Sequence, residues 1–161
     1  SRTETYINGR KRNMNILVSA CLLGVECRYD GKGVLDPAVK ALLDRHFLIP
    51  VCPEIMGGLA TPRTPAERAN GRVMTRDGQD VTSSYQKGAQ QALKLALLYG
   101  CRAAILKERS PSCGNGQIYD GTFTGKLTEG EGVCAGLLKS HGIKVYGESQ
   151  IERLLEESER Y

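Results

Sequence analysis

The sequence predicts an α/β domain in which a short, mainly parallel sheet of about four strands lies between two layers of helices. Four short apolar runs are spread along 161 residues, and segments with helical spacing of apolar residues lie between them. Strands that alternate with helices are typical of parallel sheets. Short connections and right-handed crossovers favour a three-layer sandwich with the strand order 2-1-3-4. The length fits one domain, which we expect to span residues 14–161.

The predicted strands are the apolar runs MNILVSA, FLIPVC, CRAAILK and IKVYG, at residues 14–20, 47–52, 101–107 and 143–147. The first helix is predicted to begin at Asp36, an N-cap that precedes Pro37 at the first helical position, and to end near His46. Its inner face is expected to carry the apolar residues Val39, Leu42 and Leu43.

A second helix is predicted from about Thr82 to the stop signal Gly100. One apolar stripe runs along it, formed by Tyr85, Ala89, Ala92, Leu93, Ala96 and Leu97. A third helix is expected over residues 132–141 and ends at Gly142. A fourth opens with Ser149 and Glu152 in capping-box spacing and continues through IERLLEESER.

Residues 53–81 form a long excursion after the second strand. Residues 53–72 are rich in proline and glycine, and residues 73–81 predict a small hairpin that turns at Asp77 and Gly78. Irregular segments of this length in compact domains are usually binding loops or lids. Residues 114–132 are also rich in glycine but match no phosphate-loop pattern.

Composition and charge exclude some classes of protein. A net charge of +4 is too small to indicate binding to duplex DNA, although it suits a small anionic ligand. No apolar run is long enough to span a membrane and no signal peptide is visible, so we expect a cytoplasmic protein. The polar residues 1–13 are expected to be a leader or a mis-set start, outside the fold.

Three of the six cysteines follow predicted strands directly. Cys21, Cys52 and Cys113 come after the first, second and third strands, and ligands of open α/β sheets bind at the carboxyl ends of the strands. By contrast, Cys101 begins a strand and Cys134 lies on an apolar helix, so both are expected to be small buried residues. The role of Cys27, on a loop near the same edge, stays open.

Three converging thiolates allow several interpretations. They are either three unrelated buried thiols, or ligands of zinc or of an iron–sulfur cluster. Zinc normally prefers a fourth ligand, whereas His46 and His141 lie at helix ends where capping or solvation explains them. A cluster held by three cysteines leaves one iron open to a soft, sulfur-containing partner. Without a signal peptide, disulfides are the less favoured use of these cysteines.

Polar residues near these cysteines are candidates for further roles. Glu54 follows Cys52 by two positions and could carry a proton, or it could be a solvated loop residue. Ser110 and Ser112 flank a proline before Cys113 and could bind a substrate or satisfy the local backbone. Four arginines of the excursion could contact a phosphate or carboxylate, although most are expected to be solvated: Arg63, Arg68, Arg72 and Arg76.

Four motifs in this order resemble the small bacterial DUF523 proteins, which include thiouracil desulfurases. They are SACLLGVECRYDG (19–31), PVCPEIMGGLATPR (50–63), LKERSPSCG (106–114) and YDGTFTGKLTEGEGV (119–133). The resemblance covers residue 14 to nearly the end of the chain. It departs from the family at Cys134, where a threonine is expected.

The resemblance implies a Rossmann-like fold and a [4Fe-4S] cluster held by Cys21, Cys52 and Cys113, with the fourth iron open. It also implies catalytic roles for Glu54 and Ser110. From their own chemistry and position, Ser112 and Arg63 are expected to be substrate-binding residues. An aerobically handled preparation is expected to lose such a cluster.

The expected activity is the non-redox removal of sulfur from a thiolated pyrimidine base or nucleotide, with release of sulfide. In this hypothesis Glu54 activates the attacking water and Ser110 orients the heterocycle. The alternatives are a non-catalytic metal-binding module and a thiol–disulfide redox protein. Neither a membrane nor a duplex nucleic acid is expected as a partner, and nothing in the sequence supports thiolated RNA.

Overall fold

A computed structural model gives the structure of the chain and describes residues 6–7, 10–11 and 14–158. The central sheet has four parallel strands, β3 (Asn15–Ser19), β4 (Phe47–Val51), β7 (Ala103–Leu106) and β10 (Lys144–Gly147), in the spatial order β10-β7-β3-β4. All three neighbouring pairs are parallel. Counted from the β4 edge, and numbered by their order along the chain, the strands lie in the order 2-1-3-4, as predicted.

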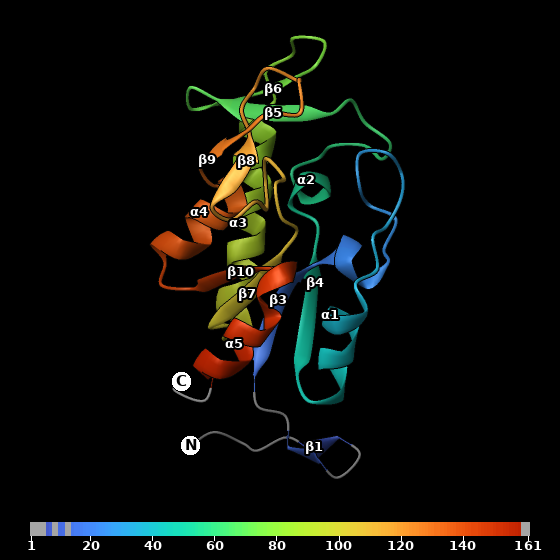
Figure 1. Ribbon diagram of the computed structural model, residues 1–161, viewed down its shortest axis with the longest axis vertical. Coiled ribbons are helices and arrows are strands. Elements are labelled where there is room, and N and C mark those ends of the chain that lie inside the picture. The colour runs from blue at the N-terminus through green and yellow to red at the C-terminus, as the bar shows by residue number, and fades with distance from the viewer. Residues whose placement is uncertain (1–5, 8–9, 12–13, 159–161) are drawn as a thin grey trace.

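Helices cover both faces of this sheet, as Figure 1 shows. On one face, β3 and β7 pack through Leu17, Ala104 and Leu106 against α3 (Thr82–Leu98) and α4 (Val133–Ser140). On the other, Ile16 and Ile105 pack against α1 (Pro37–Ala41) and α5 (Ile151–Ser158). Successive side chains of a strand point to opposite faces, so both faces of the central strands are buried. The predicted three-layer sandwich is confirmed.

The first helix is shorter than predicted. Its cap is confirmed, because Asp36 Oδ1 accepts hydrogen bonds from the backbone N–H groups of Ala38 and Val39. After Ala41 the chain tightens into the 3₁₀ helix η2 (Leu42–Asp44). This tighter winding leaves Leu43 exposed, whereas Val39 and Leu42 are buried as predicted.

Two further predictions for the helices need correction. On α3, the stripe of buried residues ends at Ala96, and Leu97 is 59% exposed although it was expected on the buried face. At the C-terminal helix, Ser149 does not cap α5. The chain first forms η3 (Glu148–Gln150), where Gln150 Oε1 accepts from the Gly147 N–H at 2.9 Å, and Ser149 donates to Glu108.

Two hairpins lie above the carboxyl ends of the strands, at the top of Figure 1. β5 (Ala66–Ala69) pairs with β6 (Arg72–Thr75) through a turn at Asn70 and Gly71. The hairpin of β5 and β6 lies mostly in the segment that was expected to be irregular. β6 also takes part in the hairpin predicted over residues 73–81, which is confirmed: it turns at Asp77 and Gly78, the Thr75 N–H donates to the Gln79 carbonyl at 2.8 Å, and Met74 forms an antiparallel bridge with Asp80. β8 (Gln117–Tyr119) pairs with β9 (Leu127–Glu129) inside the glycine-rich segment, where no strand was expected.

Four short elements complete the described chain. η1 (Ala20–Leu23) follows β3, and α2 (Pro53–Met56) follows β4 within the excursion that was expected to be irregular. β1 (Tyr6–Ile7) pairs with β2 (Arg10–Lys11) inside the segment expected to be a leader. The assignment of residues 1–13 as a leader stays a prediction. No helix of the described residues is both long and apolar enough to cross a membrane.

Candidate functional site

A cavity of about 400 Å³ opens above the carboxyl ends of β3, β4 and β7 and is bounded on the far side by the two hairpins. This volume lies in the range of small-molecule sites. Cys21, Cys52 and Cys113 all line the cavity. Each is delivered by a different strand, because Cys21 lies in η1 after β3, Cys52 is the N-cap of α2 after β4, and Cys113 lies in the turn after β7. The three cysteines therefore meet at one cavity, as predicted.

Cys52 and Cys113 are held in an environment that favours their neutral thiol form. Burial raises the pKa of Cys113 to about 12. A side-chain hydrogen bond with Cys27, together with burial, raises the pKa of Cys52 well above its ordinary range. Loading a metal cofactor must therefore displace protons, since thiolates and not thiols bind metals.

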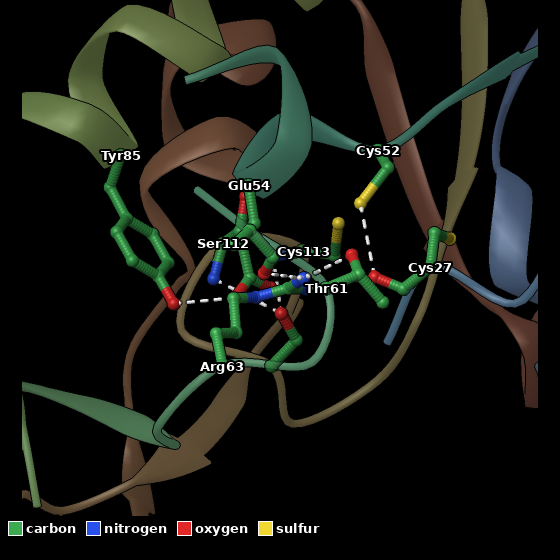
Figure 2. A network of polar contacts seen from close by, with 10 residues as sticks. Cys27, Cys52, Glu54, Thr61, Arg63, Tyr85, Ser112 and Cys113 are labelled. Carbon is green, nitrogen blue, oxygen red and sulfur yellow. Dashed lines mark hydrogen bonds and ion pairs between the residues drawn. The ribbon is translucent and has the colours of Figure 1, made fainter. Parts of the chain in front are cut away.

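Cys27 also lines the cavity, beside two of the predicted ligands. A side-chain hydrogen bond with Cys21 raises the pKa of Cys27, and the Cys52 thiol donates to the Cys27 carbonyl oxygen at 3.7 Å (Figure 2). The site thus contains four cysteines, and the fourth is the one that the sequence left open. Cys101 and Cys134 are buried in the core under α3 and α4, as predicted for them.

Within the described residues, no three His, Cys, Asp or Glu side chains lie close enough to hold a single metal ion. A zinc ion places its sulfur ligands about 2.3 Å away, so two such sulfurs can be at most about 4.6 Å apart. A multi-iron cluster binds each cysteine to a different iron and needs a wider arrangement. Three thiols that line one cavity are therefore candidate ligands of such a cluster.

Glu54 is an acidic residue of the cavity that two other side chains hold in place. Its Oε1 accepts a hydrogen bond from the Tyr85 hydroxyl at 2.6 Å and from Arg63 Nε at 3.1 Å (Figure 2). Its Oε2 accepts no hydrogen bond from any described residue. Burial and the nearby Glu54 charge raise the pKa of Tyr85, which therefore stays protonated and donates. The carboxylate is fixed through one oxygen and can act through the other.

Arg63 contacts protein groups with all three of its nitrogens. Besides Glu54, it donates to the Cys27 carbonyl at 2.9 Å and to Ala60 and Thr61 at 3.2 and 3.1 Å. Only 9% of its side chain is exposed. Arg63 thus contacts both Glu54 and the Cys27 loop while it lines the cavity, and the substrate contact suggested by the sequence stays a prediction.

The two serines before Cys113 have different environments. Ser110 lines the cavity, and its oxygen accepts from the N–H groups of Ser112 and Cys113 at 3.1 and 3.0 Å. A hydroxyl has two lone pairs and one proton, so both lone pairs are used and the proton is left to donate. Ser112 is 0% exposed and does not line the cavity. Its Oγ has no hydrogen bond of normal geometry among the described residues. Burial still raises the pKa of Cys113, and the nearby Ser112 hydroxyl offsets a small part of that rise.

Two residues with a place in this site were not singled out from the sequence. Tyr85 belongs to a helical stripe that indicates core packing, and nothing in that pattern shows that its hydroxyl reaches Glu54. Ser19 ends β3 and lines the cavity, and its Oγ accepts from the Lys107 N–H at 2.8 Å. Ser19 could have been found from the sequence, because it ends a predicted strand at the edge where ligands bind.

Fold and site define a class: an α/β domain whose parallel strands present several cysteines, a carboxylate and a serine to one cavity at the carboxyl edge of the sheet. Within this class, the chain belongs to the 2-thiouracil desulfurase family, whose family model matches residues 16–150. The fit of that model over most of the domain confirms the family resemblance and identifies an enzyme family.

Two relatives extend this comparison. The chain is 43% identical over 150 residues to the uncharacterized protein YbbK of Bacillus subtilis (strain 168). That alignment covers 87% of this chain and 99% of YbbK. It is 47% identical to the solved structure of the [4Fe-4S]-dependent thiouracil desulfidase TudS (DUF523Vcz), with a TM-score of 0.84. The match covers 88% of this chain and 95% of that one.

Proposed function

We propose that the chain is a [4Fe-4S]-dependent desulfurase that removes sulfur from a thiolated pyrimidine base or nucleotide by non-redox hydrolysis. The observation that carries this proposal is one cavity lined by thiols from three strand ends and by a carboxylate fixed through one oxygen. The likeness to a [4Fe-4S]-dependent thiouracil desulfidase at 47% identity supports it.

Cys21, Cys52 and Cys113 would hold the cluster, because thiolates are the usual ligands of iron–sulfur clusters and these three come from separate strand ends. When bound, the cluster supplies an iron without a protein ligand, a Lewis acid with affinity for a soft sulfur atom. Cys52 must then give up its hydrogen bond to the Cys27 carbonyl. An open iron of this kind suits a reducing compartment, which agrees with a cytoplasmic location.

The overall reaction exchanges the sulfur of a thiocarbonyl for the oxygen of water. The new bond joins the ring carbon to the water oxygen, the carbon–sulfur bond breaks, and the two protons of water leave with the sulfur as hydrogen sulfide. No electron is gained or lost by the protein. The reaction therefore needs a base that takes a proton from water and a donor that stabilises the heterocycle.

Glu54 and Ser110 meet these needs. Glu54 Oε2 is free to accept a proton from water while Tyr85 and Arg63 hold the carboxylate through Oε1. The Ser110 hydroxyl donates a hydrogen bond to a ring heteroatom, since both of its lone pairs accept from backbone N–H groups. In this arrangement Arg63 acts through Glu54, and Ser112 acts through Cys113 rather than through substrate.

The test is anaerobic reconstitution of the cluster, followed by incubation with 2-thiouracil, 4-thiouracil or 4-thiouridine monophosphate and measurement of released sulfide. Release from at least one compound is expected. Cys113→Ser should lose iron and labile sulfide, Glu54→Gln should keep both and lose turnover, and the core variant Cys101→Ser should keep both and remain active. No sulfide from any compound, with an intact cluster, would overturn the proposal.

The place of Cys27 beside Cys21 and Cys52 favours one alternative, a thiol–disulfide redox protein. That function predicts activity in cluster-free protein and a thiol count that falls on oxidation. A structural metal module predicts one equivalent of zinc without iron or labile sulfide. The reconstitution experiment separates these outcomes from the desulfurase.

A further inference from the structure

Phe123 lies in the loop between β8 and β9 and lines the cavity that also contains the cysteines. Its backbone φ is 58°, in the left-handed region that bulky residues rarely adopt. Strained residues of this kind persist only where the surrounding structure fixes them, and they cluster at functional sites. The YDGTFTGK motif that contains Phe123 has no role in the reaction scheme above, so its place at the cavity calls for an explanation.

The loop is held in this conformation by a residue of the other hairpin. Glu67, on β5, accepts through Oε1 from the backbone N–H of Gly121 at 2.9 Å and of Phe123 at 3.1 Å. A β-carbon on Gly121 would come within 2.6 Å of Ala69 Cβ, so the two hairpins approach too closely for any other residue there. The two hydrogen bonds to Glu67 therefore fix the direction in which the Phe123 side chain projects.

Arg76 lies over the Phe123 ring in this part of the cavity. Its guanidinium carbon lies 5.8 Å from the centre of the Phe123 ring, and both residues line the cavity. Phe123 is only partly buried, although it is an apolar side chain fixed at the cost of backbone strain. A rigid aromatic ring that borders a cavity and is not packed into the core is suited to contact a flat ligand.

We propose that Phe123 is a substrate-contacting residue that stacks on the heterocyclic ring and selects planar aromatic thiocarbonyl compounds. This inference rests on the proposed function and deepens it by naming the feature that selects the substrate class. Stacking of a base on an aromatic side chain changes affinity by roughly 5- to 150-fold. Glu67 is then a positioning residue, because it acts through the backbone of Phe123.

The test compares Phe123→Leu and Phe123→Tyr with wild type, all loaded with cluster. Leucine keeps an apolar side chain and the same strain at positive φ but has no ring, whereas tyrosine keeps the ring. Phe47→Leu is the matched control, since Phe47 is the only other phenylalanine and begins β4 at the opposite end of the sheet. The measurements are iron content, KM and kcat for 2-thiouracil, and the Kd of the product uracil by calorimetry.

We expect Phe123→Leu to raise the KM and the uracil Kd at least fivefold with unchanged iron content, and Phe123→Tyr and Phe47→Leu to stay within about twofold of wild type. Uracil binding by Phe123→Leu as tight as in wild type would overturn the inference, and so would a loss that Phe123→Tyr shares or that follows loss of iron.

The two proposals fail in different ways. If wild type binds uracil but releases no sulfide, the desulfurase proposal fails, and the Phe123 inference is still decided by the uracil Kd values. If wild type binds neither uracil nor 2-thiouracil, the Phe123 inference fails as well.

A fourth variant separates function from folding. Phe123→Gly removes the ring and also the strain, because glycine adopts positive φ without penalty. We expect its melting temperature to equal or exceed that of wild type while uracil binding is lost to the same extent as in Phe123→Leu. Intact binding in this variant would contradict the stacking role.

Discussion

The contact between α2 and α3 allows a sharp test of how the fold positions Glu54. Gly57, at the end of α2, and Gly88, on α3, let the two backbones touch. A β-carbon on Gly88 would lie 1.7 Å from the Pro53 carbonyl oxygen, where 3.4–4 Å is ordinary contact. Gly88→Ala must therefore push α2 away from α3 by more than 1 Å. The Glu54–Tyr85 hydrogen bond of 2.6 Å joins the same two helices and would be stretched or broken.

Two magnitudes follow from this displacement. Overpacking against backbone costs about 1–3 kcal/mol, and the better helix propensity of alanine returns about 0.5–1 kcal/mol. A net loss of about 1 kcal/mol lowers the melting temperature of a chain of this size by about 2–4 °C. A misplacement of about 1 Å at a catalytic group lowers turnover by about 10²-fold.

The assays are thermal unfolding and sulfide release from 2-thiouracil. Gly136→Ala is the matched control, because Gly136 lies within α4 and a β-carbon there meets only Glu131 Oε2 at 3.4 Å, the end of a flexible side chain. We expect this control to be as stable as wild type, or slightly more stable, and fully active. If Gly88→Ala matches Gly136→Ala in both assays, the helix contact does not position Glu54 and the reasoning is wrong.

Three further predictions concern single groups. Tyr85→Phe removes the short hydrogen bond to Glu54 and should lower turnover about tenfold with unchanged iron content, which sulfide release and iron analysis would check; full activity would show that Arg63 alone positions Glu54. Asp36→Ala removes the N-cap of α1 and should lower the melting temperature by about 2–4 °C without affecting turnover. Burial raises the pKa of Cys101 from 9.0 to about 11, so the unfolded state releases this proton first and stability should fall by about 2 kcal/mol between pH 9 and 11. Cys101→Ala removes this contribution, and urea unfolding of both proteins across that range should show a shallower decline in the variant.

The positions of the candidate ligands could be predicted because strand ends are a property of the sequence pattern. Cys21, Cys52 and Cys113 each follow an apolar run, and parallel strands present their carboxyl ends at one edge of the sheet. Asp36 and Gly100 marked helix ends correctly for a similarly local reason, since capping depends on a few neighbouring residues.

The hairpins were harder to place because their pattern is weak. The strands β8 and β9 have three residues each and lie among glycines, so no alternation of apolar residues marks them. The hairpin turn at Asp77 and Gly78 was predicted, whereas the turn at Asn70 and Gly71 lies in the segment that was expected to be irregular. That turn depends on the pairing of Ala66–Ala69 with Arg72–Thr75, which local sequence does not encode strongly.

The sequence by itself determined the three-layer fold, the order of the strands and the edge at which the cysteines meet, because apolar periodicity and helix caps act over short distances along the chain. Only the tertiary structure decided which side chains face one another across that edge. Arg63 contacts Glu54 and the Cys27 loop, Tyr85 contacts Glu54, and Ser112 is buried away from the cavity. These pairings join residues up to 36 positions apart, so they depend on how packed helices and loops approach in space and not on any local pattern.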